Sequence, residues 1–283
     1  ASWLTIPVDF TIWPLKLPKL DAPTTFGTIF NLFYDYDRDG ATDLGKYYSS
    51  SQPLSPAMKQ QYFDLMCDNR VPADNCYRGG DTQDPARPSS LPMYRPMEDY
   101  ISLARCGSRL FNLLDVSALS GNGTMKTNYS AMELDSMMSQ LEPAVSKLEA
   151  AGLMDRAYVY GFDERPVSYG RAIYQVFGAV KAKFPKLRTV AVLRWDPGKY
   201  AGLELSKVLD IWVNLYSLWD EERARAWSAI GGQHEAWAYH CISPRPYPHT
   251  KPVKFLNTFI EDDSIDARLL SWWSLRYGAQ GWL

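Results

Sequence analysis

The chain has 283 residues and a mass of 32.2 kDa, which suits one barrel-sized domain or two small ones. Its 30 Lys and Arg residues face 32 Asp and Glu residues, giving a net charge of -2 and a pI near 6.0. Without a basic excess, we expect neither a nucleic-acid-binding nor a membrane-surface protein. No apolar run approaches the ~18 residues that a membrane span needs. The 10 Trp, 18 Tyr and 11 Phe residues are more than a typical domain carries, and they can stack on sugars or fill cores.

Hydrophobic periodicity and turn residues predict strands alternating with helices. The first half of the chain is expected to hold a strand over 28–36, a helix over 56–67, a loop over 71–92, a helix over 98–105, a strand over 110–116 and a helix over 131–151. The second half is expected to hold strands over 157–162, 189–193, 211–215 and 236–242 and a last strand from 281, with helices over 169–184, 203–208, 221–229 and 265–277.

This alternation predicts βαβ units and a parallel sheet. Seven strands are counted, and the stretch between Cys76 and Arg95 has room for a weak eighth. We therefore expect an α/β fold, a (β/α)₈ TIM-type barrel, rather than a doubly wound sheet. Residues 1–24 are assigned to a lead-in segment and residues 25–283 to the barrel, with the chain stopping inside the barrel at its C-terminal end.

The cysteines bear on metals and on the compartment. Cys67, Cys76, Cys106 and Cys241 form no CxxC motif, and the chain has three histidines, so we expect no zinc site and no cofactor. A disulfide between Cys67 and Cys76 would close a short loop, and four free thiols are the open alternative. Two glycosylation sequons, Asn122-Gly-Thr and Asn128-Tyr-Ser, favour a secreted, secretory or lysosome-like location, against the alternative that both arise by chance.

Two further motifs fail on inspection. The run from Gly40 to Lys46 has the spacing of a phosphate-binding loop, but Tyr47 stands where magnesium needs Ser or Thr. The acidic residues from Asp35 to Asp43 resemble a calcium loop, but Lys46 occupies the position of the bidentate Glu. We expect a solvated acidic turn and no metal there.

The pair Asp163-Glu164 is the strongest candidate site. It directly follows the apolar strand predicted over 157–162, and Pro166 opens a loop before the next helix. In a parallel barrel, catalytic groups gather at the carboxyl ends of the strands. Two carboxylates this close repel, so one is expected to keep a proton and act as an acid. The alternative is that the pair caps the following helix.

Aromatic side chains mark the later strands. A two-residue period places Trp212, Asn214 and Tyr216 on one face, and it places Trp237 and Tyr239 together on the next strand. These residues are expected to line a pocket. Glu235 precedes its strand, which places it at the opposite end of the barrel.

The whole chain resembles the catalytic barrels of glycoside hydrolase family 123, which are β-N-acetylgalactosaminidase-like. The resemblance rests on the order and spacing of several short motifs. They are Val8–Trp13, Thr25–Gly27, Asn69-Arg-Val-Pro72, Ala157–Tyr160 followed by Asp163–Pro166, Trp237–Cys241, and Arg268–Trp272 followed by Tyr277–Gly281. Asn69 departs from the family, which often has His before the Arg.

The resemblance implies removal of β-linked N-acetylgalactosamine by a retaining, substrate-assisted reaction, in which the 2-acetamido oxygen replaces the enzyme nucleophile. Asp163 would orient the acetamide, and Glu164 would protonate the leaving oxygen and later activate water. The implied partner is therefore a glycan with a 2-acetamido sugar. Candidates for substrate contacts are Arg70, Tyr160, Asn214, Tyr216, Trp237 and Tyr239.

Two alternatives stay open. A conventional two-carboxylate glycosidase would need a second acid after a late strand, and Asp220 is the nearest one. A non-catalytic sugar-binding relative would bind the same ligand without turnover.

Overall fold

The computed structural model describes residues 25–26, 56–69, 71, 74, 97–120, 125–193, 197, 200, 202–241, 256–258 and 263–283. The predicted strand over 28–36, the acidic turn, the weak eighth strand, Arg70, Cys76 and the Asn122 sequon all lie outside these residues. None of the described helices is long and apolar enough to cross a membrane.

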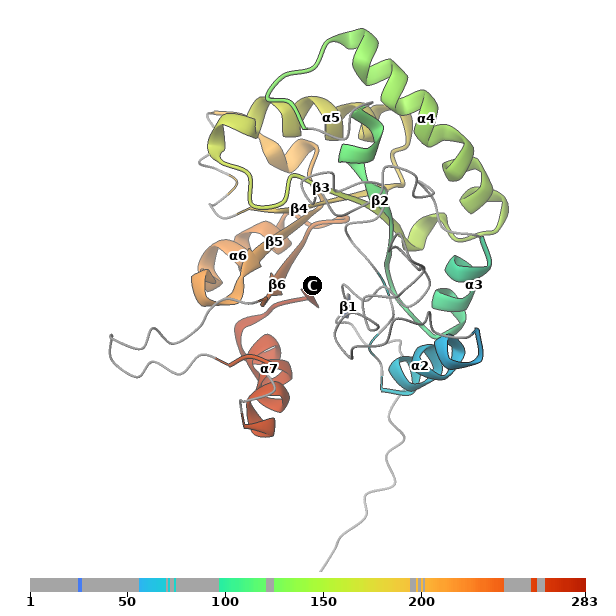
Figure 1. Ribbon diagram of the computed structural model, residues 1–283. Coiled ribbons are helices and arrows are strands. Elements are labelled where there is room, and N and C mark those ends of the chain that lie inside the picture. The colour runs from blue at the N-terminus through green and yellow to red at the C-terminus, as the bar shows by residue number, and fades with distance from the viewer. Residues whose placement is uncertain are drawn as a thin grey trace, which may run out of the picture.

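A parallel sheet forms the centre of the molecule (Figure 1). Its order is β1-β7-β6-β5-β4-β3-β2, in which β1 is a two-residue pairing at the β7 edge. The strands are β1 (Thr25–Phe26), β2 (Phe111–Asp115), β3 (Ala157–Gly161), β4 (Arg188–Val192), β5 (Ile211–Leu215), β6 (Glu235–Tyr239) and β7 (Gly281–Trp282).

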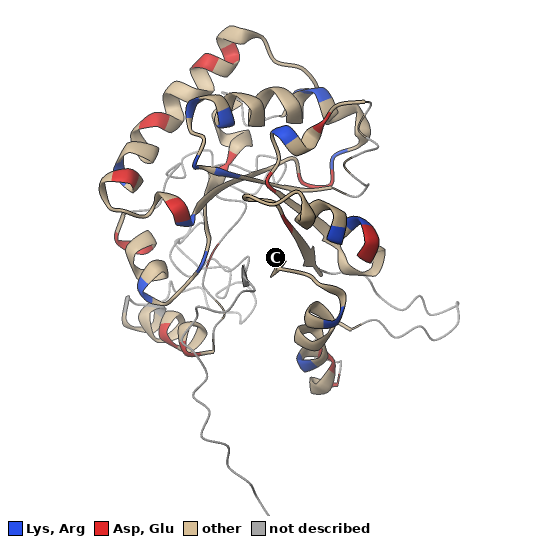
Figure 2. Ribbon diagram, turned by 180° about the vertical axis from the view of Figure 1, so that it is seen from behind, with Lys and Arg blue, Asp and Glu red and all other residues tan. Residues whose placement is uncertain are grey.

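Six α-helices are described, and α4, α5, α6 and α7 lie along the outer side of the sheet (Figure 1). The helices are α2 (Pro56–Asp68), α3 (Met97–Arg105), α4 (Ala131–Ala150), α5 (Gly170–Lys183), α6 (Glu221–Ala229) and α7 (Ser264–Tyr277). Short 3₁₀ turns join them: η1 (Val116–Ser120), η2 (Met154–Arg156), η3 (Val167–Tyr169), η5 (Leu205–Lys207) and η6 (Tyr216–Leu218). Acidic and basic residues are spread over these outer helices (Figure 2).

The prediction of a closed (β/α)₈ barrel is wrong. The six strands β2–β7 form an all-parallel, curled half-barrel that β1 extends by two residues, and β1 and β2 stand at opposite edges of the sheet. The sheet is strongly curled, as the hydrogen bond from Arg109, beside β2, to Glu235 of β6 shows. In a flat sheet, strands four places apart are separated by about 19 Å. Curling therefore brings β2 and β6 face to face, although among the described strands no pairing closes the ring.

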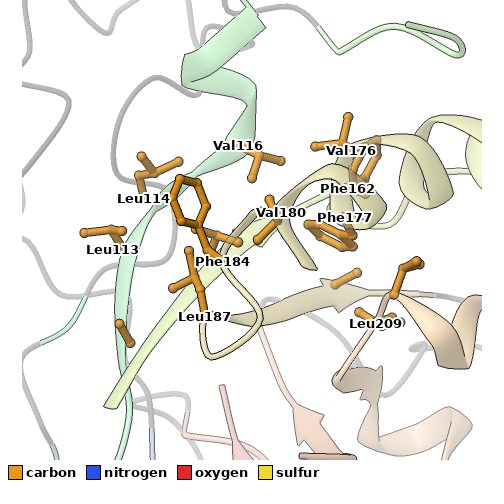
Figure 3. Packing of buried hydrophobic residues seen from close by; sticks show 14 of the residues in the cluster. Leu113, Leu114, Val116, Phe162, Val176, Phe177, Val180, Phe184, Leu187 and Leu209 are labelled. Atoms are coloured by element: carbon orange, nitrogen blue, oxygen red, sulfur yellow. The ribbon is translucent and has the colours of Figure 1, made fainter. Parts of the chain in front are cut away.

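Alternating side chains give the sheet two buried faces. On the outer face, Val159, Ala191 and Trp212 join a large apolar core under α4 and α5. Figure 3 shows part of this core, in which Phe162 packs edge-on against Phe177 of α5. The concave face carries a second cluster, built from Leu110, Tyr158, Tyr160, Val190, Val192, Ile211, Val213, Trp237 and Tyr239.

Cys67 at the end of α2 is bonded to Cys106, which follows α3. The expected pairing of Cys67 with Cys76 is therefore wrong. The two bonded residues are 39 positions apart in sequence, and packing of α2 beside α3 brings their Cα atoms to 5.5 Å. Spacing along the chain favoured the nearer partner, whereas the fold selects the one that the helices bring together.

Candidate functional site

The backbone turns sharply where β3 ends. Phe162 and Glu164 both have positive φ angles, 59° and 46°, which non-glycine residues seldom adopt. Two contacts hold this turn: the buried Phe162 ring packs against Phe177, and the Glu164 amide donates to the Val192 carbonyl at 2.9 Å. Such conformations cost about 1–3 kcal/mol each and persist where the surroundings impose them. The turn therefore directs the side chain of Glu164 away from the outer core.

Glu164 is exposed, and its carboxylate is held by one partner. Tyr239, the last residue of β6, donates its hydroxyl hydrogen bond to Oε1 of Glu164. Within the described part of the chain, Glu164 makes no ion pair and no second side-chain hydrogen bond. Asp163, half-buried, lies beside it in sequence.

The contact between Tyr239 and Glu164 depends on the curl of the sheet, because β3 and β6 are three places apart. Burial raises the pKa of the Tyr239 phenol, and its hydrogen bond to Glu164 and the charges of Glu164 and Asp163 raise it further. The phenol therefore stays protonated and acts as a donor over the whole physiological range.

The alternative that the acidic pair caps the next helix is not supported. The positions that precede η3 and α5 are Pro166 and Tyr169, and neither cap takes a side-chain hydrogen bond. Arg165 instead lies 5.5 Å from the centre of the Tyr169 ring, and its carbonyl accepts from the buried Tyr200 hydroxyl at 3.1 Å. The segment is thus fixed by its own neighbours, and Glu164 is free of a capping role.

Two other predicted contact residues share the concave face with Tyr239 but lie below the surface. Tyr160 lies in β3, three residues before Asp163, and is fully buried. Trp237 is also fully buried, and its indole donates to Glu235 at 2.8 Å and lies edge-on to Tyr158. A Cβ atom on Gly281 would lie 2.4 Å from this indole, so the tryptophan is packed tightly by the neighbouring strand. Both rings pack in the same buried cluster as Tyr239.

Asn214 and Tyr216 are not brought to the candidate site. Trp212 of the same strand face packs in the outer core, so this face of β5 points toward the helices. Asn214 donates to the Leu218 carbonyl at 3.3 Å. Tyr216 donates to the Leu256 carbonyl at 2.5 Å and packs against Trp273 and Trp282. The period of two grouped these residues correctly, but it could not tell which face is concave.

His240 follows Tyr239 and was not among the predicted site residues. Its Nδ1 accepts from the Trp282 indole at 2.7 Å, and its Nε2 lies 2.9 Å from Thr258 Oγ1. Burial lowers the pKa of His240, so the ring is neutral at physiological pH. Its position directly after a strand was the sequence signal that could have identified it. The histidine ties β6 to β7 beside Tyr239.

No cluster of three or more His, Cys, Asp or Glu side chains suited to a metal occurs among the described residues. Two hollows lie on the outer side of the sheet on either side of Leu203, one against α6 and one against α5. Neither is lined by Glu164 or Tyr239. The candidate site is therefore the exposed Glu164 and the half-buried Asp163 at the carboxyl end of β3, with Tyr239 of β6 bonded to Glu164 across the curled sheet.

No model of a known protein family matches the chain, and no curated protein is significantly similar to it. The resemblance to glycoside hydrolase family 123 remains a prediction from the sequence motifs.

Proposed function

We propose that the chain is a glycoside hydrolase that removes β-linked N-acetylgalactosamine by retaining, substrate-assisted catalysis. The observation that carries this proposal is the exposed Glu164 at the carboxyl end of β3, held at one oxygen by Tyr239 and adjacent to Asp163. In open α/β sheets, ligands bind outside the carboxyl ends of the strands, so the location suits a substrate without a closed barrel.

In the first step, the acetamido oxygen of the substrate attacks the anomeric carbon as the glycosidic C–O bond breaks. The leaving oxygen takes the proton of Glu164, and Asp163 stabilises the positive charge on the ring nitrogen of the oxazolinium. In the second step, water attacks the same carbon as its bond to the acetamido oxygen breaks, which restores the acetamide. Glu164 takes a proton from the water, which returns the acid to its starting form. Tyr239 would keep one oxygen of Glu164 fixed while the other transfers the proton.

The conventional two-carboxylate alternative finds less support. Asp220, its predicted second acid, is the N-cap of α6, where Oδ1 accepts from the Arg223 amide at 3.1 Å. Its other oxygen pairs with the Arg223 side chain at 3.0 Å. A carboxylate engaged at both oxygens is poorly suited to attack a sugar.

The test compares aryl and alkyl β-N-acetylgalactosaminides with the matching β-galactosides. We expect hydrolysis of the acetamido sugars alone, because no protein group replaces the acetamide nucleophile. Glu164→Gln should lose about 10²–10⁴-fold on the alkyl glycoside, which needs protonation to depart, and much less on the aryl one. Tyr239→Phe should lose roughly tenfold or more in kcat, since it removes one hydrogen bond to the carboxylate that forms as Glu164 gives up its proton.

Glu222→Gln is the matched control, because Glu222 is exposed on α6 and takes part in no hydrogen bond or ion pair among the described residues. It should leave both rates unchanged. Efficient cleavage of the plain β-galactoside would move the proposal to the two-carboxylate mechanism. Binding of N-acetylgalactosamine without turnover of any substrate would indicate the sugar-binding alternative.

A further inference from the structure

The segment that leads into α4 contains a sequon whose two polar residues have very different surroundings. Ser130 is the N-cap of α4, with Oγ accepting from the Glu133 amide at 3.3 Å. The Glu133 carboxylate in turn accepts from the Ser130 amide at 2.8 Å, which completes a capping box. Helix capping therefore accounts for the serine without any reference to modification.

Asn128, unlike Ser130, does not cap the helix. It is exposed, and its side chain makes no hydrogen bond within the described part of the chain. Asparagine in a loop commonly bonds its own backbone nearby, and this one does not. The fold thus explains Ser130 and leaves the asparagine two residues earlier without a structural function.

The neighbouring residues hold Asn128 outward. Tyr129 is buried, and its amide and carbonyl bond the side chain of Gln175 on α5 at 3.0 and 2.9 Å. Its hydroxyl accepts from the Lys126 amide at 3.0 Å, and Met125 is buried beside it. Because the chain is anchored on both sides of Asn128, its amide projects from the surface with room for a large substituent.

We propose that Asn128 carries an N-linked glycan and that the chain passes through a secretory compartment. The Asn128 side-chain nitrogen forms the bond to the anomeric carbon of a lipid-pyrophosphate-linked oligosaccharide. The lipid pyrophosphate leaves, and the amide loses one proton. The Cys67–Cys106 disulfide supports this location, because such bonds persist in oxidising compartments. This proposal is independent of the glycosidase activity.

The capping box also sets the order of events. The transferring enzyme must read the Ser130 hydroxyl, which in the folded chain bonds Glu133. Transfer therefore precedes formation of the first turn of α4, and the finished glycan leaves the cap intact.

The experiment expresses the full chain with a secretion signal in a eukaryotic host, in an Asn122→Gln background that removes the other sequon. Intact mass before and after treatment with a peptide N-glycosidase should reveal one glycan, and peptide mapping should find Asp at position 128 after release. Adding Asn128→Gln should abolish the mass shift. Ser130→Thr keeps both the sequon and the helix cap, and Glu133→Gln alters the capping box and the ion pair with Lys126 but not the sequon. Both variants should retain the mass shift.

Secretion at the unmodified mass, or a mass shift that survives Asn128→Gln, would overturn the proposal. If Asn122→Gln itself prevents secretion, the same peptide mapping on the unsubstituted chain decides the question, since it reads position 128 directly. Asn at position 128 after enzyme treatment would then count against it.

Discussion

The two ends of the curled sheet use the same residue types for different purposes. At the amino end, Glu235 is 7% exposed and accepts hydrogen bonds from Arg109, Arg188 and the Trp237 indole. At the carboxyl end, Glu164 is exposed and is held by one neutral phenol. A carboxylate that is buried and fully paired has no capacity left for a substrate, whereas one that is exposed and held at one oxygen has.

A second buried pair reinforces the amino end. Asp210, directly before β5, accepts from Lys181 at 3.0 Å and from the Thr189 amide at 2.9 Å. The Thr189 hydroxyl donates to the Val208 carbonyl at 2.7 Å, and its oxygen lies 3.2 Å from the same carboxylate. In parallel α/β proteins, this end of the sheet is typically devoted to stability and the other to chemistry. The charges here follow that division, even though the sheet does not close.

The largest effect should come from breaking the amino-end ion pair. Glu235→Gln removes the carboxylate that Arg109 and Arg188 both contact, and removing one partner of a buried pair costs up to about 3–5 kcal/mol. Glu142→Gln is the matched control, because Glu142 pairs with Lys183 on the surface at 2.8 Å, and such pairs contribute about 0–1 kcal/mol. Chemical denaturation measures both losses. Equal destabilisation by the two variants would contradict the division between the ends.

Acid should weaken the amino end through the same residue. Burial opposes the charge of Glu235, but Arg109, Trp237 and Arg188 outweigh it and lower its pKa. A carboxyl whose pKa is lower in the folded state stabilises the fold above its unfolded value, which is about 4.3. That stability is lost as the pH falls below about 4.3 and through the folded value.

The measurement is the free energy of unfolding between about pH 7 and pH 2. It should fall more steeply below about pH 4.3 in the unsubstituted chain than in Glu235→Gln. Hydrogen bonds from Lys126 and Ser130 lower the pKa of the exposed Glu133 to about 2, but this residue is present in both proteins and cancels from the difference. Parallel curves for the two proteins would show that Glu235 is not the titrating group.

Secondary structure followed closely from the sequence, and the details that depend on pairing did not. The strand over 211–215 and the helix over 221–229 were predicted at their observed bounds. The strand is a short apolar run between polar residues, and the helix places Ala224 and Trp227 three residues apart on its buried face. Closure of the sheet depends on whether the edge strands pair, which no local period encodes. For the same reason, the location of Glu164 after β3 was predictable, but its contact with Tyr239 three strands away required the curl.

The smallest effect concerns Asp220, which lies near the carboxyl end of the sheet and is paired at both oxygens, as the amino-end carboxylates are, but is exposed. It caps α6 and pairs with Arg223, and both side chains are 45% exposed. Asp220→Ala should therefore cost about 1 kcal/mol of stability, as the loss of a cap does, and leave the hydrolysis rate unchanged. Asp220→Asn keeps a capping oxygen and should recover most of that stability. Thermal denaturation and the aryl glycoside assay measure the two quantities on the same samples. A large loss of rate in both variants at normal stability would make Asp220 a catalytic group, and it would favour the two-carboxylate mechanism over the acetamide nucleophile.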